Sequence, residues 1–101
     1  MGDRSHHLPA KERVILELLI EHGSLFGLQL VEQSDGALKR GTVYATLARM
    51  EAKGLVASEQ EEMRDGAIGL PRRFYRPTPL GKRVLRAWAV WTGAFAVEGA
   101  R

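Results

Sequence analysis

The hydrophobic positions of the first fifty residues follow the spacing of three helices, which short polar or glycine-containing turns separate. The first helix is expected to begin at Leu8-Pro9 and to end at Gly23, because proline suits a first helical turn and glycine a helix end. A turn over 24–27 precedes a short second helix over 28–33. Helical spacing also places three apolar residues of a third helix on one inward face, and these are Val43, Leu47 and Met50.

Two strands should follow the third helix directly. Gly54 ends the helix, one strand runs from Leu55 to about Glu62, a turn lies over 65–69 and the returning strand covers 72–76. A last helix is expected to begin at Thr78-Pro79, since threonine caps a helix and proline fits the next position. This order predicts a mainly α protein with a small β-hairpin, namely a winged helix-turn-helix with an added C-terminal dimerisation helix.

The pattern divides the chain into three parts. Residues 1–8 lack periodicity and are expected to form a flexible arm, residues 9–78 the winged helix-turn-helix domain, and residues 79–101 the dimerisation helix. His6 and His7 have no third ligand nearby, so no metal site is expected. With 101 residues, the chain can bury one small core, to which a dimer interface would add.

Composition and charge narrow the possible functions. The chain has no cysteine, no signal peptide and no apolar run near the roughly 20 residues of a membrane span, so we expect a cytoplasmic protein without a disulfide or membrane partner. Residues 1–34 carry 3 basic and 5 acidic side chains, whereas residues 35–101 carry 12 and 7. The cations therefore gather in the half with the predicted wing, which indicates a polyanionic partner.

The third helix carries small, hydroxylated and basic residues outside its apolar face. Methyl groups can contact thymine, hydroxyls can bond base edges or phosphates, and arginine can pair with guanine. A solvated face of small residues is the alternative for the helix, and a solubilising surface is the alternative for the arginines of the wing. The residues expected to contact double-stranded DNA are Lys39, Arg40, Thr42, Tyr44, Ala45, Thr46, Arg49, Lys53, Arg64, Arg72 and Arg73.

Three acidic residues of the hairpin oppose DNA binding. Glu59, Glu61 and Glu62 are expected on the strand away from the duplex, where they would limit non-specific binding.

The last helix has an apolar stripe that includes two tryptophans. A stripe of this size is a liability when it is exposed, so a partner helix in a homodimer is expected to cover it, and the alternative is packing against the first helix of the same chain. A symmetric dimer would read a roughly palindromic operator. The residues expected at the dimer interface are Val84, Trp88, Trp91 and Phe95.

Over about residues 8–88 the sequence resembles the PadR family of bacterial transcriptional regulators. The first motif of that family has a Gly, an aliphatic residue and a Tyr, which are followed by a Leu, a Glu, a Gly and the aliphatic start of a strand. The second motif is a basic pair, which is followed by aromatic residues, a Thr and a Gly. The corresponding residues are Gly41, Val43, Tyr44, Leu47, Glu51, Gly54, Leu55 and Val56, then Arg72, Arg73, Phe74, Tyr75, Thr78 and Gly81. The opening Leu8-Pro9 and the pair Phe26-Gly27 are also similar to the family.

Two positions depart from the family pattern, because Ala45 stands where proline is common and Pro77 where an aliphatic residue is usual. The operator preference of relatives is therefore not transferred. The short C-terminal extension resembles the compact subfamily, in which dimers form through the last helix, helped by the first. Some relatives bind flat aromatic drugs between tryptophans, which implies a possible effector site at Trp88 and Trp91, with ordinary packing as the alternative.

The resulting hypothesis is a homodimeric, sequence-specific DNA-binding regulator, most simply a repressor, which a small aromatic ligand could release. A repressor needs only affinity and position at a promoter. The alternative is a winged helix that binds another protein and no DNA. No enzyme and no cofactor are expected, because the sequence lacks a nucleophile with a nearby base, a phosphate-binding glycine loop and a paired set of carboxylates.

Overall fold

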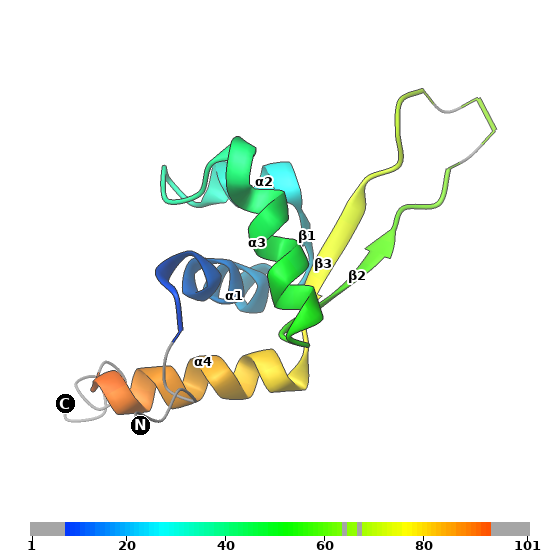
Figure 1. Cartoon of the computed structure of the whole chain (residues 1–101). Coiled ribbons are helices and arrows are strands. Elements are labelled where there is room, and N and C mark those ends of the chain that lie inside the picture. Colours follow the sequence, from blue (N-terminus) through cyan, green and yellow to red (C-terminus); the bar gives the residue numbers. More distant parts are fainter. Residues whose placement is uncertain (1–7, 64, 67, 94–101) are drawn as a thin grey trace.

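The computed structural model describes residues 8–63, 65–66 and 68–93. Within them the chain forms a mainly helical domain from which a β-hairpin projects (Figure 1). The elements in chain order are α1 (Ala10–His22), β1 (Leu25–Phe26), α2 (Gly27–Gln33), α3 (Arg40–Ala52), β2 (Val56–Gln60), β3 (Arg73–Pro77) and α4 (Pro79–Thr92). The four predicted helices are thus confirmed, and the starts of α1 and α2 differ from the predicted ones by one or two residues.

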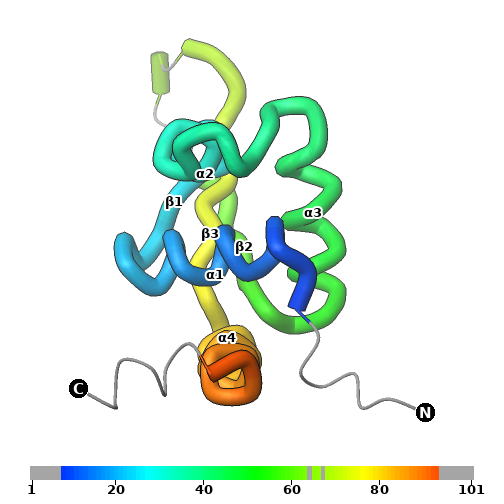
Figure 2. Tube along the Cα trace, turned by 90° about the vertical axis from the view of Figure 1, so that its left-hand side faces the viewer, coloured from blue at the N-terminus to red at the C-terminus, as the bar shows by residue number. Residues whose placement is uncertain are grey.

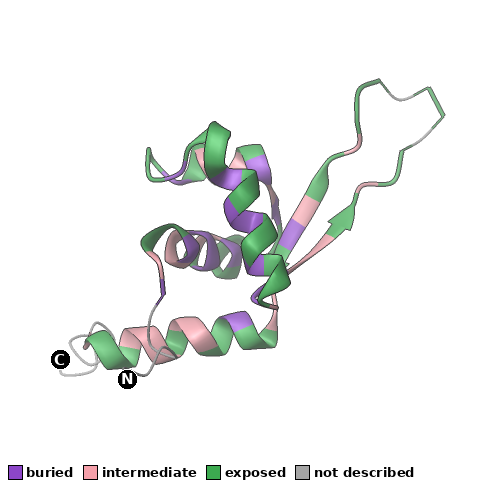
Figure 3. Ribbon diagram, in the orientation of Figure 1, coloured by how far each residue is buried: buried purple, intermediate pink, exposed green. Residues whose placement is uncertain are grey.

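The core lies between α1, α2, α3 and the base of the sheet. The predicted inward face of α3 is confirmed, because its three apolar residues are buried, and Figure 3 shows this face turned toward α1. Burial of such side chains supplies most of the stability of a small domain. The fully buried side chains of the core include Ile15, Leu16, Leu19, Leu30, Val43, Leu47 and Met50.

The sheet has three antiparallel strands in the order β1-β3-β2, so the expectation of a two-stranded ribbon is corrected. The additional strand β1 pairs with β3 and places Phe26 opposite Phe74, whose ring centroids lie 5.5 Å apart in an edge-to-face contact. Two residues are too few to show the alternation that marks a strand in a sequence. Strand β1 therefore ties the base of the hairpin to the start of α2.

The hairpin formed by β2 and β3 is the wing. Its paired part runs from Val56 opposite Pro77 to Gln60 opposite Arg73, slightly shorter than predicted, and the connecting segment extends away from the helices (Figure 1). The predicted contact residue Arg64 and the predicted interface residue Phe95 lie outside the described residues, as do His6 and His7, for which no metal site is expected.

Helix α4 begins at the predicted threonine cap. The hydroxyl of Thr78 accepts a hydrogen bond from the Gly81 amide at 3.0 Å and donates one to the Gly54 carbonyl at 2.6 Å. Helix α4 then lies against α1, and Figure 2 views it nearly along its axis. Gly81 allows the start of α4 to lie close to the segment between α3 and β2, because a Cβ atom there would collide with the carbonyl oxygen of Leu55. No helix among the described residues is long and apolar enough to cross a membrane.

Candidate nucleic-acid interface

The outermost line of α3 consists of four exposed residues without long side chains. Successive positions three or four apart share one face of a helix, which groups them opposite the buried face. Such a surface lets the helix backbone approach another molecule closely, as a helix must when it enters the major groove of DNA. The residues of this reading line are Gly41, Ala45, Ala48 and Ala52.

One flank of the reading line carries Thr42 and Arg49, which are exposed as predicted. Thr46 is different, because only 2% of its surface is accessible, and its predicted place on the outer surface is wrong. On the helical wheel Thr46 lies between Thr42 and the buried Met50. Its hydroxyl donates to the Thr42 carbonyl at 3.2 Å and accepts from Arg49 at 3.3 Å, so it helps to position that guanidinium.

The ends of α3 carry the other cations expected on this helix. Lys39 is the N-cap and Arg40 the first helical residue, and both are exposed. Lys53 follows the last turn, where its ammonium binds both carboxylate oxygens of Glu12 at 2.9 and 3.1 Å. The positive charge of Lys53 is thus already balanced within the domain.

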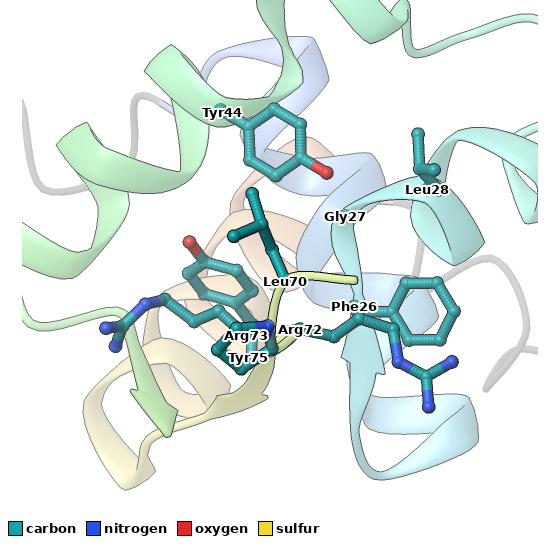
Figure 4. A pocket seen from close by; sticks show the side chains of 9 residues that line it. Phe26, Gly27, Leu28, Tyr44, Leu70, Arg72, Arg73 and Tyr75 are labelled. Carbon is teal, nitrogen blue, oxygen red and sulfur yellow. The ribbon is translucent and has the colours of Figure 1, made fainter. Parts of the chain in front are cut away.

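Tyr44 lies on the opposite flank, toward the wing. A Cβ atom at Gly27 would lie 2.5 Å from the Tyr44 ring, so the glycine makes room for this aromatic side chain at the start of α2. Between Tyr44 and the base of the wing is a groove of about 550 Å³ (Figure 4), which Tyr75 and the largely exposed Leu70 also line. The groove was not predicted, because its walls come from three separate segments.

A chain of hydrogen bonds connects the reading helix with the wing. The Ser58 hydroxyl of β2 donates to the Glu51 carboxylate at 2.7 Å and accepts from Arg73 at 2.9 Å. Glu51 also acts on Tyr75, whose pKa is raised mainly by burial and further by this negative charge. The predicted contact residue Arg73 is therefore exposed but held in a defined position beside α3.

Arg72 has a different environment from Arg73. Its guanidinium forms two hydrogen bonds with the Glu61 carboxylate, at 3.1 and 2.8 Å, and lies 4.7 Å from the centre of the Phe26 ring. These hydrogen bonds lower the pKa of Glu61 from 4.5 to about 2. Arg72 thus connects the wing with β1, and its charge is offset by Glu61.

The far part of the wing is apolar and exposed. Ile68 and Leu70 expose 98% and 91% of their surfaces, and Met63 is exposed as well. The sequence predicts no role for these residues. These residues lie beyond the paired strands, so the core of the described residues covers none of them.

The stripe on α4 is only partly covered within the chain. Val84 and Trp88 pack against the core, and the Arg13 guanidinium of α1 lies 5.0 Å from the centre of the Trp88 ring. Trp91, one turn further along, exposes 67% of its surface. The alternative of packing within the chain therefore applies to Val84 and Trp88, and Trp91 is the more exposed of the two tryptophans.

The protein has three helices around a small core, a hairpin after the third helix and an open reading line on that helix. This is the architecture of a winged helix-turn-helix protein. Residues 15–87 match the Transcriptional regulator PadR-like family. This match covers most of the chain, and the chain belongs to that family. The resemblance seen in the motifs is thereby confirmed.

Individual relatives agree with this assignment. Transcriptional regulator Rv3488 of Mycobacterium tuberculosis is 49% identical over 45 residues, which are 45% of this chain and 38% of that protein, so the chain aligns with less than half of that relative. A PadR family transcriptional regulator from Eggerthella lenta is 31% identical with a TM-score of 0.66, over 89% of this chain and 79% of that one.

A further solved structure shares the fold. Bacillus subtilis PadR in complex with operator DNA is 20% identical with a TM-score of 0.71, over 83% of this chain and 49% of that one. At this level of identity the similarity concerns the fold alone.

Proposed function

We propose that the protein is a homodimeric repressor that binds a specific, roughly palindromic DNA operator. The observation that carries this proposal is the open reading line of α3, which stands beside a projecting wing and between exposed cations. The family of transcriptional regulators and the fold shared with an operator-bound relative support it. Such a protein would bind DNA without catalysing a reaction, and it would act in the cytoplasm.

The reading line would enter the major groove, which is about 12 Å wide and admits a helix. Arg49 could pair with a guanine or a phosphate, and Lys39 and Arg40 could bind the backbone near the start of α3. Arg73 would meet the backbone where the duplex passes from α3 to the wing. Residues 9–78 would thus form the DNA-binding domain, in which Thr42, Tyr44, Ala45 and Arg64 would also contact DNA. Residues 79–101 would hold the dimer.

The dimer would form along α4. An exposed tryptophan gains a large apolar contact area when a partner covers it, and Val90 and Leu80 of the same helix are also exposed. A two-fold axis between two such helices would separate the reading helices by about 34 Å or a multiple of it, one turn of DNA. Trp91 and Phe95 would line the interface together with those parts of Val84 and Trp88 that the core leaves exposed, and a flat aromatic effector could bind between Trp88 and Trp91.

Selection of bound fragments from genomic DNA, followed by footprinting, tests the proposal. We expect one enriched site with two similar halves in opposite orientation, protected by a protein that sediments as a dimer. Lys11→Ala removes an exposed cation of α1, which lies outside α3, the wing and α4, and serves as a control that should select the same site. Recovery of random fragments only, or protection of a single half-site by a monomer, contradicts the proposal.

The exposed apolar residues of the wing favour a second candidate, a winged helix that binds another protein. Ile68 and Leu70 would supply the apolar contact, and the neighbouring Glu62 and Asp65 are exposed acidic residues that suit a basic partner. Binding to random duplex DNA over a range of salt concentrations separates the candidates. Affinity that falls steeply with salt supports DNA binding, and its absence at low salt supports the protein partner.

A further inference from the structure

A groove of about 290 Å³ lies between α1 and α4, away from the reading line. Ile20 of α1 forms one wall, and Leu85 and Ala89 of α4 supply the remaining apolar surface. Lys82 and Arg86, also on α4, complete the lining. Figures 1 and 2 both show α1 above α4, and the two helices are in contact.

The charges of α4 are unusual for a helix. The helix carries Lys82, Arg83 and Arg86 and no acidic residue from Pro79 to Thr92. Lys82 and Arg86 stand one turn apart, an arrangement in which like charges repel. Lys82 and Arg83 also lie near the N-terminal end, where the helix dipole disfavours cations.

No carboxylate compensates these charges in the described part of the chain. None of the ion pairs found there involves Lys82, Arg83 or Arg86, and Glu17 of α1 binds Arg13. An anion placed between Lys82 and Arg86 would relieve both their mutual repulsion and the unfavourable dipole interaction.

We infer that the groove between α1 and α4 binds a small organic anion with an aliphatic body, such as a medium-chain carboxylate. Lys82 and Arg86 bind the carboxylate group through charge-assisted hydrogen bonds. The aliphatic body covers Ile20, Leu85 and Ala89 and removes their surface from water. The volume is at the lower end for small-molecule sites, which matches a short chain better than a large ring system.

This site differs from the proposed aromatic effector site in place and in chemistry. Its walls are aliphatic, and neither tryptophan of α4 lines it. The inference also stands apart from DNA binding, since none of its five residues lies on α3 or on the wing.

Titration of the full chain with octanoate, followed through the backbone amide signals in two-dimensional NMR spectra, tests the inference. We expect saturable shifts at Ile20, Leu85 and Ala89. Octanol has the same aliphatic body without the charge, and acetate has the charge without the body. Both should bind at least about tenfold more weakly, because each lacks one of the two interactions.

Variants assign the roles of the individual side chains. Lys82→Gln and Arg86→Gln should each weaken octanoate binding about tenfold, the effect of losing one charge-assisted hydrogen bond. Arg83→Gln removes an equal charge from the same helix outside the groove and should leave the affinity nearly unchanged. Ala89→Leu should block binding by filling the groove while all three cations remain.

Four results would overturn the inference. They are equal binding of octanol and octanoate, equal weakening by Arg83→Gln, shifts confined to Trp88 and Trp91, and a change of oligomeric state in the Lys82 or Arg86 variants without an effect on octanoate. The first would reveal a merely apolar surface, the second general attraction of anions, and the third another site. The last would show that the cations serve contact with a second copy.

Discussion

The ammonium of Lys53 lies 2.9 Å from a carboxylate oxygen of Glu12 and thereby joins the end of α3 to the first turn of α1. The Glu12 side chain is only 3% exposed, whereas that of Lys53 is 50% exposed. A buried carboxylate needs such a partner, because removing its water without compensation costs several kcal/mol. The pair therefore fixes the reading helix on the scaffold helix.

Lys53→Ala should accordingly lower stability rather than affinity for DNA. We expect a loss of about 1–3 kcal/mol in the free energy of unfolding, since Glu12 would keep its buried position without its partner. Urea denaturation measures this loss, and Arg83→Ala is the control, since it removes an exposed cation that takes part in no ion pair among the described residues. If Lys53→Ala instead reduced the salt dependence of DNA binding and left the free energy of unfolding unchanged, the structural role of Lys53 would be contradicted.

Arg49→Ala and Arg73→Ala should weaken DNA binding and reduce its salt dependence. Each removes one cation from the surface that faces the duplex, so the slope of log K against log salt should fall by about one. Fluorescence anisotropy with a labelled duplex measures both quantities. Unchanged slopes for both variants would show that the duplex lies on another surface.

The Glu61–Arg72 pair should persist in moderately acidic solution. The pKa of Glu61 is about 2 in the folded protein and 4.5 in the absence of these hydrogen bonds. Because the folded value is the lower one, the pair contributes to wing stability above about pH 4.5, and this contribution is lost as the pH falls toward 2. NMR titration of the Glu61 carboxyl carbon should give the low value, and Arg72→Gln should return it toward 4.5. A pKa near 4.5 in the unaltered protein contradicts the pairing.

Gly81→Ala should destabilise the domain by about 1–3 kcal/mol, the usual cost of overpacking. The added methyl group would meet the carbonyl oxygen of Leu55, which is backbone and cannot rotate away as a side chain could. Gly41→Ala is the matched control, since it changes a helical glycine with no neighbour within 4 Å of the new methyl group. Thermal unfolding should show a lower midpoint for Gly81→Ala alone, and equal midpoints would refute the close contact.

Local patterns predicted much of this fold. The inward face of α3 follows from the spacing of Val43, Leu47 and Met50, and the start of α4 follows from Thr78 and Pro79, because both signals lie within a few residues. Strand β1 gave no such signal, since it has only two residues and depends on pairing with β3.

The surface was harder to predict, because it depends on contacts between distant residues. The sequence could not show that Lys53 pairs with a residue 41 positions away, or that Arg72 meets Glu61 across the wing. Thr46 was misplaced for a related reason, since a helical wheel does not show how widely the core covers the sides of a helix. The groove beside Tyr44 likewise exists only once three segments have come together.

The most direct test of the account places a carboxylate on the reading line. Ala48→Glu should reduce the affinity for the selected operator at least about a hundredfold, because a carboxylate against the phosphates costs several kcal/mol. Ala10→Glu adds the same exposed charge at the start of α1 and should bind nearly as well as the unaltered protein. Equal operator affinity of the folded Ala48→Glu variant and this control would contradict the proposal that α3 reads DNA.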